Sequence, residues 1–198
     1  MTSIYKQRID SSVSRWQEEY TDCINSKDPE TFFLQHFNQL SVLNIEPFDC
    51  VNNRLITFNV AAGITCDFKC CPHNHQLCHN EPLRSTPVIV VQISEIVKQY
   101  LSQQLSTSLT LQGLEPLDNM DGVLWLLWYF RRKSKDPIFI WTGYEEEEVA
   151  TLIGLVRFLQ WKSIFLKMGR YRWGEKPHYD ENLGVFLASP NQYCKKIF

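Results

Sequence analysis

LITFNVAAGITCDFKCCPHNHQLCHN, residues 55–80, joins a strand-like apolar run to a loop crowded with thiols and imidazoles. Residues 55–60 predict a β-strand, which the small residues 61–63 end. Four of the chain's seven cysteines and three of its five histidines lie in the loop, residues 63–80. Soft ligands gathered on one short loop suit zinc, copper(I) or an iron–sulfur cluster. The stretch therefore predicts a metal centre mounted on a rigid strand.

The composition is that of an ordinary globular protein. The 198 residues allow one sizeable domain with its own core. A net charge of −2 does not indicate a broad nucleic-acid footprint. The longest apolar run, residues 123–130, is far shorter than the ~20 residues that a membrane-spanning helix needs. Residues 1–6 contain no apolar signal core. We therefore expect a soluble, cytoplasmic protein that binds neither nucleic acid nor membrane.

The remaining three cysteines, Cys23, Cys50 and Cys194, stand alone in the sequence. A free cysteine is often just a small buried hydrophobe, so we expect these thiols to pack without a ligand. For the cysteines of the loop, a disulfide pair is disfavoured because cytosolic thiols stay reduced.

Residues 1–50 predict a separable, helical N-terminal extension. Apolar residues recur at roughly helical spacing between Ile4 and Trp16. Residues 28–30, Asp-Pro-Glu, resemble a helix start and predict a second helix over 31–43. We expect one domain over residues 1–50 and a second over residues 51–198.

From residue 54 onward, strand-like and helix-like segments alternate. Such alternation implies parallel strands joined by right-handed crossovers, with the active site at the carboxyl ends of the strands. The expected fold class is therefore α/β, a partial (β/α) barrel of parallel strands with an N-terminal helical extension. The expected strands are 54–60, 88–91, 108–112, 137–141 and 163–166, the last one, and the expected helices are 94–104, 120–132 and 145–159.

Unusual residues follow four of these strands. The cysteine loop follows the first strand, the segment Gly-Leu-Glu-Pro at 113–116 follows another, and Thr-Gly-Tyr at 142–144 and Lys167 follow two more. The four segments should converge on one rim. Three thiolates, from Cys66, Cys70 and Cys78, can hold three irons of a [4Fe–4S] cube, which leaves the fourth iron open to the amine and carboxylate of a ligand.

At this point the residues resemble a known family. The loop GITCDFKC (63–70), closed by Cys-His-Asn (78–80), resembles the cluster loop of radical S-adenosylmethionine enzymes, and its ending is like that of activases of glycyl-radical enzymes. The segment GLEPL (113–117) resembles the Gly-Gly-Glu-Pro segment of that superfamily. The segments WTGY (141–144), LKMGRY (166–171) and Asn-Gln (191–192) resemble the activating protein of anaerobic (class III) ribonucleotide reductase.

The resemblance implies that residues 51–198 form a radical S-adenosylmethionine partial-barrel domain. It implies that Cys66, Cys70 and Cys78 ligate a [4Fe–4S] cluster, and that backbone at Leu77 and His79 contacts the adenine end of S-adenosylmethionine.

The other implied contacts lie on the remaining rim segments. Gly113 and Glu115 would hold the methionine ammonium, since a carboxylate suits an ammonium and glycine lets backbone approach closely. Thr142 and Lys167 would contact the ribose or the carboxylate.

The implied activity is that of an oxidoreductase. One electron cleaves the sulfonium to give methionine and a 5′-deoxyadenosyl radical, which takes a hydrogen atom from a glycine of a partner protein. The implied partners are the large subunit of anaerobic ribonucleotide reductase, a glycyl-radical protein, and an electron donor such as flavodoxin.

The loop departs from the family pattern in its spacing. Seven residues separate Cys70 and Cys78 where two are usual, so Cys71 or His73 could join or replace a ligand. Leu77 stands where an aromatic residue is common, and the second glycine of the Gly-Gly-Glu-Pro segment is Leu114.

Two other functions stay open. A radical S-adenosylmethionine enzyme could act on another glycyl-radical enzyme or on a small molecule. Alternatively, the three cysteines with His73 or His79 could form a closed tetrahedral site in a zinc-stabilised interaction module.

Overall fold

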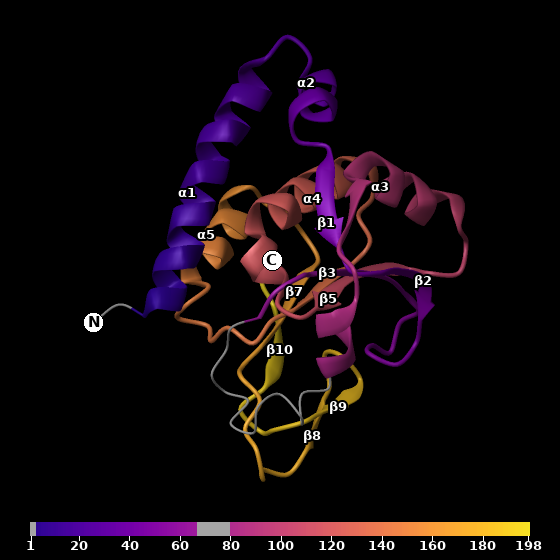
Figure 1. The fold of residues 1–198 in the computed structure, drawn as a ribbon, viewed down its shortest axis with the longest axis vertical. Coiled ribbons are helices and arrows are strands. Elements are labelled where there is room, and N and C mark those ends of the chain that lie inside the picture. The colour runs from indigo at the N-terminus through magenta and orange to yellow at the C-terminus, as the bar shows by residue number, and fades with distance from the viewer. Residues whose placement is uncertain (1–2, 67–79) are drawn as a thin grey trace.

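The computed structural model describes residues 3–66 and 80–198, and it shows a mixed α/β fold around a six-stranded sheet (Figure 1). The strand order is β10-β7-β6-β5-β3-β2. The four inner strands are parallel, and both edge strands run antiparallel to their neighbours. The sheet contains β2 (Ile45–Asp49), β3 (Thr57–Gly63), β5 (Ser108–Gly113), β6 (Ile138–Trp141), β7 (Ile164–Met168) and β10 (Tyr193–Lys196).

Helices and two small sheets complete the fold. Strand β1 pairs antiparallel with β4, and β8 pairs antiparallel with β9. These elements are β1 (Gln39–Val42), β4 (Ile89–Gln92), β8 (His178–Asp180), β9 (Val185–Leu187), α1 (Ile4–Asn25), α2 (Pro29–His36), α3 (Ile93–Ser102), α4 (Met120–Lys133), α5 (Ala150–Phe158) and the short 3₁₀ helices η1 (Glu81–Ser85) and η2 (Pro116–Asn119).

The expected α/β class and the parallel inner strands are confirmed. The sheet is open within the described ranges, because β2 and β10 pair only with their inner neighbours and close no barrel. No helix among the described residues is both long enough and apolar enough to cross a membrane.

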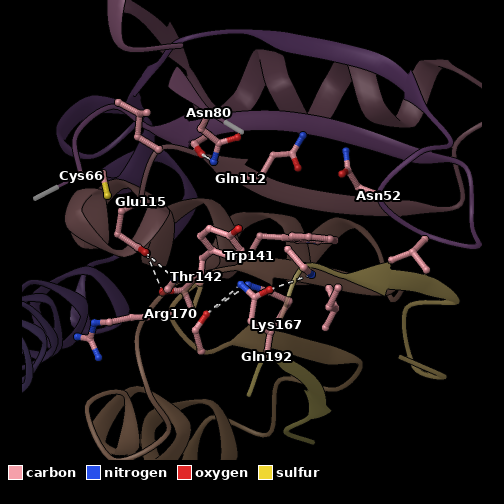
Figure 2. Close-up of a pocket in the computed structure, with 18 of the residues that line it drawn as sticks. Asn52, Cys66, Asn80, Gln112, Glu115, Trp141, Thr142, Lys167, Arg170 and Gln192 are labelled. Atoms are coloured by element: carbon pink, nitrogen blue, oxygen red, sulfur yellow. Dashed lines mark hydrogen bonds between the residues drawn. The ribbon is translucent and has the colours of Figure 1, made fainter. Parts of the chain in front are cut away.

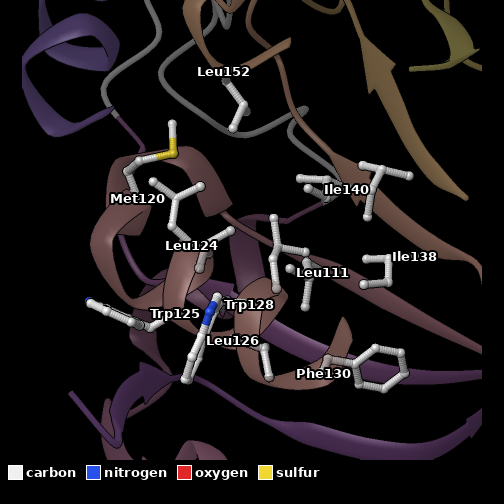
Figure 3. Packing of buried hydrophobic residues seen from close by; sticks show 14 of the residues in the cluster. Leu111, Met120, Leu124, Trp125, Leu126, Trp128, Phe130, Ile138, Ile140 and Leu152 are labelled. Atoms are coloured by element: carbon white, nitrogen blue, oxygen red, sulfur yellow. The ribbon is translucent and has the colours of Figure 1, made fainter. Parts of the chain in front are cut away.

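Side-chain alternation gives the sheet two different faces. On one face, Leu111, Ile138 and Ile140 pack against α4 in the main core (Figure 3). On the other face, Phe139 belongs to a smaller core with Leu183 of the C-terminal region. These inner strands are buried on both faces, although polar residues alternate with apolar ones in β3 and β5.

The N-terminal region differs from the expectation after residue 36. The helix expected over 31–43 ends at His36, and residues 39–42 form β1. Between them, the Asn38 side chain accepts a hydrogen bond from the Ser94 backbone N–H at 2.8 Å and donates one to the Ser94 hydroxyl at 2.9 Å. This long-range contact turns the chain into an extended strand, and no local pattern announces it.

Helix α1 shares its core with the rest of the chain. Trp16 is fully buried, its ring stacks on Tyr20 with a centroid distance of 4.8 Å, and it also contacts Trp125 of α4 and Trp161 beyond α5. Strand β2 likewise pairs with β3 across residue 50. The domain division at residue 50 stays a prediction, and residues on both sides of it pack together.

Two expectations about the strands were wrong. The strand at 163–166 is not the last, because β8, β9 and β10 follow, and β10 pairs with β7 at the sheet edge. These three strands have three or four residues each, which is too short for a clear alternating pattern. The strand expected at 88–91 corresponds to β4, but it pairs with β1 outside the central sheet.

Helix α5 also begins later than expected, at Ala150 rather than Glu145. In the turn before it, Glu148 is buried and pairs with Arg170 at 2.7 Å, so it is not a solvated carboxylate of a helix surface.

We predict that Trp16→Ala lowers the free energy of unfolding by about 3–5 kcal/mol, because it removes a large buried ring from the shared core. Urea unfolding monitored by circular dichroism measures this change. Glu18→Ala, on the exposed side of the same helix, should change stability by less than about 0.5 kcal/mol. A Trp16→Ala variant as stable as Glu18→Ala would show that α1 does not share the core.

Candidate functional site

The carboxyl ends of β3, β5, β6 and β7 border one pocket of about 360 Å³ (Figure 2). Five residues singled out from the sequence line it, namely Cys66, Gly113, Glu115, Thr142 and Lys167. The structure therefore brings together segments that are up to 100 residues apart, at the strand ends where parallel sheets place their sites.

The other residues of the predicted site fall in residues 67–79, outside the described residues. They are the predicted cluster ligands Cys70 and Cys78, the predicted adenine contacts Leu77 and His79, and the alternative ligands Cys71 and His73.

Two glycines allow the ends of β3 and β5 to touch. Gly63 lies opposite Gly113 in the pairing of the two strands. A Cβ atom on Gly63 would lie 2.5 Å from the backbone nitrogen of Glu115, and one on Gly113 would lie 2.7 Å from the carbonyl oxygen of Gly63. Gly113 also has a φ of +115°, which disfavours any other residue. Only glycine fits at either position without a shift of the backbone.

Backbone hydrogen bonds continue this contact beyond the strands. The N–H of Leu114 donates to the carbonyl of Gly63 at 2.8 Å, and the N–H of Glu115 donates to the carbonyl of Thr65 at 2.9 Å. Cys66 follows directly, with its side chain partly buried on the pocket wall. The position of Cys66 relative to Glu115 is thus fixed by backbone pairing.

The C-terminal end of the cysteine loop, at Asn80, also contacts the end of β5. The amide of Asn80 donates to the carbonyl oxygen of Gly113 at 2.7 Å. The guanidinium of Arg84, in η1, lies 3.4 Å from the carbonyl oxygen of Cys66. Both described ends of the loop are therefore fastened to the ends of β3 and β5. The sequence marked Asn80 only as part of a motif and gave it no role.

Glu115 is a buried carboxylate with three donors. It is 1% exposed. One carboxylate oxygen, Oε1, accepts hydrogen bonds from the Thr142 hydroxyl at 2.7 Å and the Leu117 N–H at 3.0 Å, while Oε2 accepts one from the Gly143 N–H at 2.8 Å. Burial raises the pKa of Glu115 to about 7, although these three donors favour the ionised form, and nearby Asp118 adds a smaller upward shift.

A comparison with known protein families decides the class of this site. Residues 54–186 match a family model described as a 4Fe-4S single cluster domain, which covers more than half of the chain. The chain belongs to this family. No curated protein and no solved structure gives a significant match.

The described part of the 4Fe-4S domain fits such a cluster. Cys66 supplies a thiol on the pocket wall, and thiolates are the usual protein ligands of these clusters. The glycine contact described above keeps side chains away from the wall beside Cys66. Of the predicted sulfur ligands, Cys66 is the one within the described ranges.

The Thr142 hydroxyl both donates and accepts a hydrogen bond within the protein. It donates to Glu115 and accepts a hydrogen bond from the Tyr144 N–H at 3.0 Å. In this arrangement Thr142 orients Glu115, and its predicted contact with a ribose or carboxylate stays a prediction.

Lys167 brings a buried cation to the pocket. It is 7% exposed, its Nζ atom lies 3.4 Å from the carbonyl oxygen of Gly169, and it lies 5.8 Å from the ring centroid of Trp141. Gln192 donates to the same carbonyl at 3.2 Å and also lines the pocket. Gln192 was visible in the sequence only as part of the Asn-Gln pair, without a role.

The opposite wall of the pocket comes from segments that the sequence did not indicate. Asn52 lies at the end away from Cys66 (Figure 2). Phe186 of β9 lines the same pocket and is 72% exposed. These segments meet because the Arg54 N–H donates to the Leu183 carbonyl at 2.7 Å, a contact between residues far apart in the chain.

We predict that Gly63→Ala lowers the free energy of unfolding by at least about 2 kcal/mol, because its Cβ would overlap the backbone at Glu115. Gly154→Ala is the control. It lies in α5 with open space around it, and it should stabilise the protein by about 0.5–1 kcal/mol. Thermal and urea unfolding of both variants measure the difference. Equal stability of the two variants would contradict the proposed backbone contact.

Proposed function

We propose that this protein is a radical S-adenosylmethionine enzyme that installs a glycyl radical on anaerobic ribonucleotide reductase. The single observation that carries the proposal is the convergence of Cys66 and Glu115 on one pocket in a member of a 4Fe-4S cluster family. A cluster ligand and a buried carboxylate on one wall suit a cofactor that carries both a sulfonium and an ammonium.

In this proposal, Cys66, Cys70 and Cys78 hold the cluster. When bound, the cluster and S-adenosylmethionine would together supply reductive cleavage of the sulfonium and an acceptor for one hydrogen atom from the glycine Cα of the partner. The electron would come from a donor protein such as flavodoxin.

Glu115 would hold the methionine ammonium. Among the described residues, its Oε2 atom accepts one hydrogen bond, from Gly143. A carboxylate oxygen can accept two, so this oxygen can take an N–H of an ammonium without losing its protein donor. Because the other donors fix the carboxylate in place, it would need little reorganisation to bind the cation.

Lys167 and Thr142 would serve the carboxylate or ribose of the ligand, and backbone at Leu77 and His79 would contact the adenine. Lys167 and Glu115 both line the pocket and carry opposite charges. A zwitterionic amino-acid group needs one partner of each sign. We further propose that the parallel strands curve as a partial barrel around this site.

The lining at the far end of the pocket favours a polypeptide as substrate. Asn52 and Gln112 have uncharged amide side chains, which suit the donors and acceptors of a peptide backbone. Next to them, Val51 and Phe186 are 76% and 72% exposed. An apolar rim beside polar amides is typical of a surface that binds a protein segment.

The first test measures iron, zinc and cofactor cleavage. Anaerobically reconstituted protein should contain iron rather than zinc, and under a strong reductant it should cleave S-adenosylmethionine to 5′-deoxyadenosine. Cys66→Ala should lose the cluster and the cleavage, because one of three iron ligands is gone.

Cys50→Ala is the matched control, because Cys50 is an exposed, free cysteine that does not line the pocket. It should keep both iron and activity, and Cys70→Ala and Cys71→Ala in parallel identify the second ligand. One stoichiometric zinc, no iron and no cleavage would replace the proposal with the zinc-stabilised module.

A second prediction concerns pH. Glu115 has a pKa of about 7 and must be ionised to bind an ammonium, so binding below pH 7 requires the release of a proton. Affinity for S-adenosylmethionine should therefore rise by up to about tenfold per pH unit between pH 5.5 and 7. Isothermal titration of the reconstituted, unreduced protein measures this slope. Glu115→Gln should bind weakly with no slope, and an equal slope in this variant would show that another group titrates.

A further inference from the structure

The start of helix α1 lies against the back of the pocket, and this contact centres on Asp118. Asp118 belongs to η2, three residues after Glu115, and its side chain is 6% exposed. A carboxylate buried this far needs polar partners that stabilise its charge.

Within the described residues, Asp118 has partners from three separate segments. Its Oδ1 atom accepts hydrogen bonds from Arg8 Nη1 at 3.1 Å and from the Tyr144 hydroxyl at 2.8 Å. The Thr65 hydroxyl lies 3.5 Å from its Oδ2 atom. One carboxylate thus joins α1, the segment before Cys66 and the segment after β6.

Two of these partners are next to a residue that lines the pocket. Thr65 precedes Cys66, and Tyr144 follows Gly143, whose N–H donates to Glu115. Movement of Asp118 would therefore displace the predicted cluster ligand and the donor to Glu115 together.

Further contacts hold the start of α1 in this place. The Ser3 hydroxyl donates to Glu148 at 2.8 Å, and Arg170, which lines the pocket, donates to the same carboxylate. The guanidinium of Arg170 lies 4.8 Å from the ring centroid of Tyr5, which packs edge-on against Tyr144 at 5.8 Å. These contacts of Ser3 and Tyr5 fix the start of α1, and they therefore hold Arg8 next to Asp118.

The charges are consistent with this role. Burial is the main cause that raises the pKa of both Glu115 and Tyr144. The negative charge of Asp118 raises both pKa values further, and the positive charge of Arg8 lowers that of Tyr144 by a smaller amount. Arg8 thus offsets part of a repulsion between two neighbouring buried carboxylates.

We propose that Arg8 is a positioning residue for the cofactor site, acting through Asp118 to hold Cys66, Glu115 and Gly143 in register. This gives the N-terminal helix a function in the site, and its ligand-dependent part rests on the proposed function. The same helix offers a control in Arg15, which pairs with Asp121 at the start of α4. That pair is more exposed, at 59% and 38%, and neither residue lines the pocket.

The first test uses hydrogen exchange of the chain without added ligand. The amides of Leu114, Glu115 and Gly143 should exchange about tenfold faster in Arg8→Gln than in the wild type, because the buried Asp118 carboxylate loses a charge partner and the hydrogen bonds around it loosen. Arg15→Gln should leave these three rates unchanged, since exposed ion pairs contribute little. Equal rates in Arg8→Gln and Arg15→Gln would overturn the proposal.

The second test measures affinity for S-adenosylmethionine with reconstituted, unreduced protein. Arg8→Gln should bind about tenfold more weakly, and Arg8→Lys should recover most of the affinity because it keeps the charge. Failure of Arg8→Lys to recover affinity, or wild-type affinity in Arg8→Gln, would overturn the proposal while leaving the proposed function intact. If the wild type with its cluster binds no S-adenosylmethionine, the proposed function fails, and the exchange rates alone decide the role of Arg8.

Discussion

The contact between Gly63 and Gly113 brings two strand ends closer than any pair of side chains would allow. Because a Cβ atom at either position would overlap backbone, the chain can continue the pairing past the sheet, with Glu115 bonded to Thr65. This places the thiol of Cys66 and the carboxylate of Glu115 on the same pocket wall. The proposed function depends on that closeness, since a cluster and the amino-acid group of the proposed ligand would have to meet within a few ångströms.

Two buried carboxylates, Glu115 and Asp118, determine the electrostatics of the site. Glu115 is held by donors from Thr142, Gly143 and Leu117, and Asp118 by donors that include Arg8 and Tyr144. Burial opposes both charges, and the donors offset that cost. The balance leaves the pKa of Glu115 near 7, so a cationic ligand can change its protonation state. Residues from the N-terminal helix thus take part in the electrostatics of the pocket.

Much of the rim could be predicted from the sequence because local patterns mark it. The segment after the expected strand 108–112 and its resemblance to a Gly-Gly-Glu-Pro segment identified Gly113 and Glu115. The cysteine-rich loop and its resemblance to a cluster loop identified Cys66. The opposite wall at Asn52 and Phe186 and the pair of Arg8 with Asp118 could not be predicted. These contacts join segments about 110 to 135 residues apart, and each segment alone reads as a loop or a helix surface. The short strands β8, β9 and β10 could not be predicted for a related reason. Their stability comes from pairing with other strands rather than from their own sequence pattern.

The family match gives a 4Fe-4S domain, and the pocket adds a buried carboxylate and a buried lysine beside Cys66, the predicted cluster ligand that lies within the described residues. The most direct measurement of this one-site arrangement is electron paramagnetic resonance of the reduced, reconstituted protein with S-adenosylmethionine labelled with ¹⁵N at its amino group. If the cluster and the ligand share the wall formed by Gly63 and Gly113, the spectrum should change on binding and show hyperfine coupling to the label. An unchanged spectrum without coupling, at a ligand concentration that saturates binding, would contradict it.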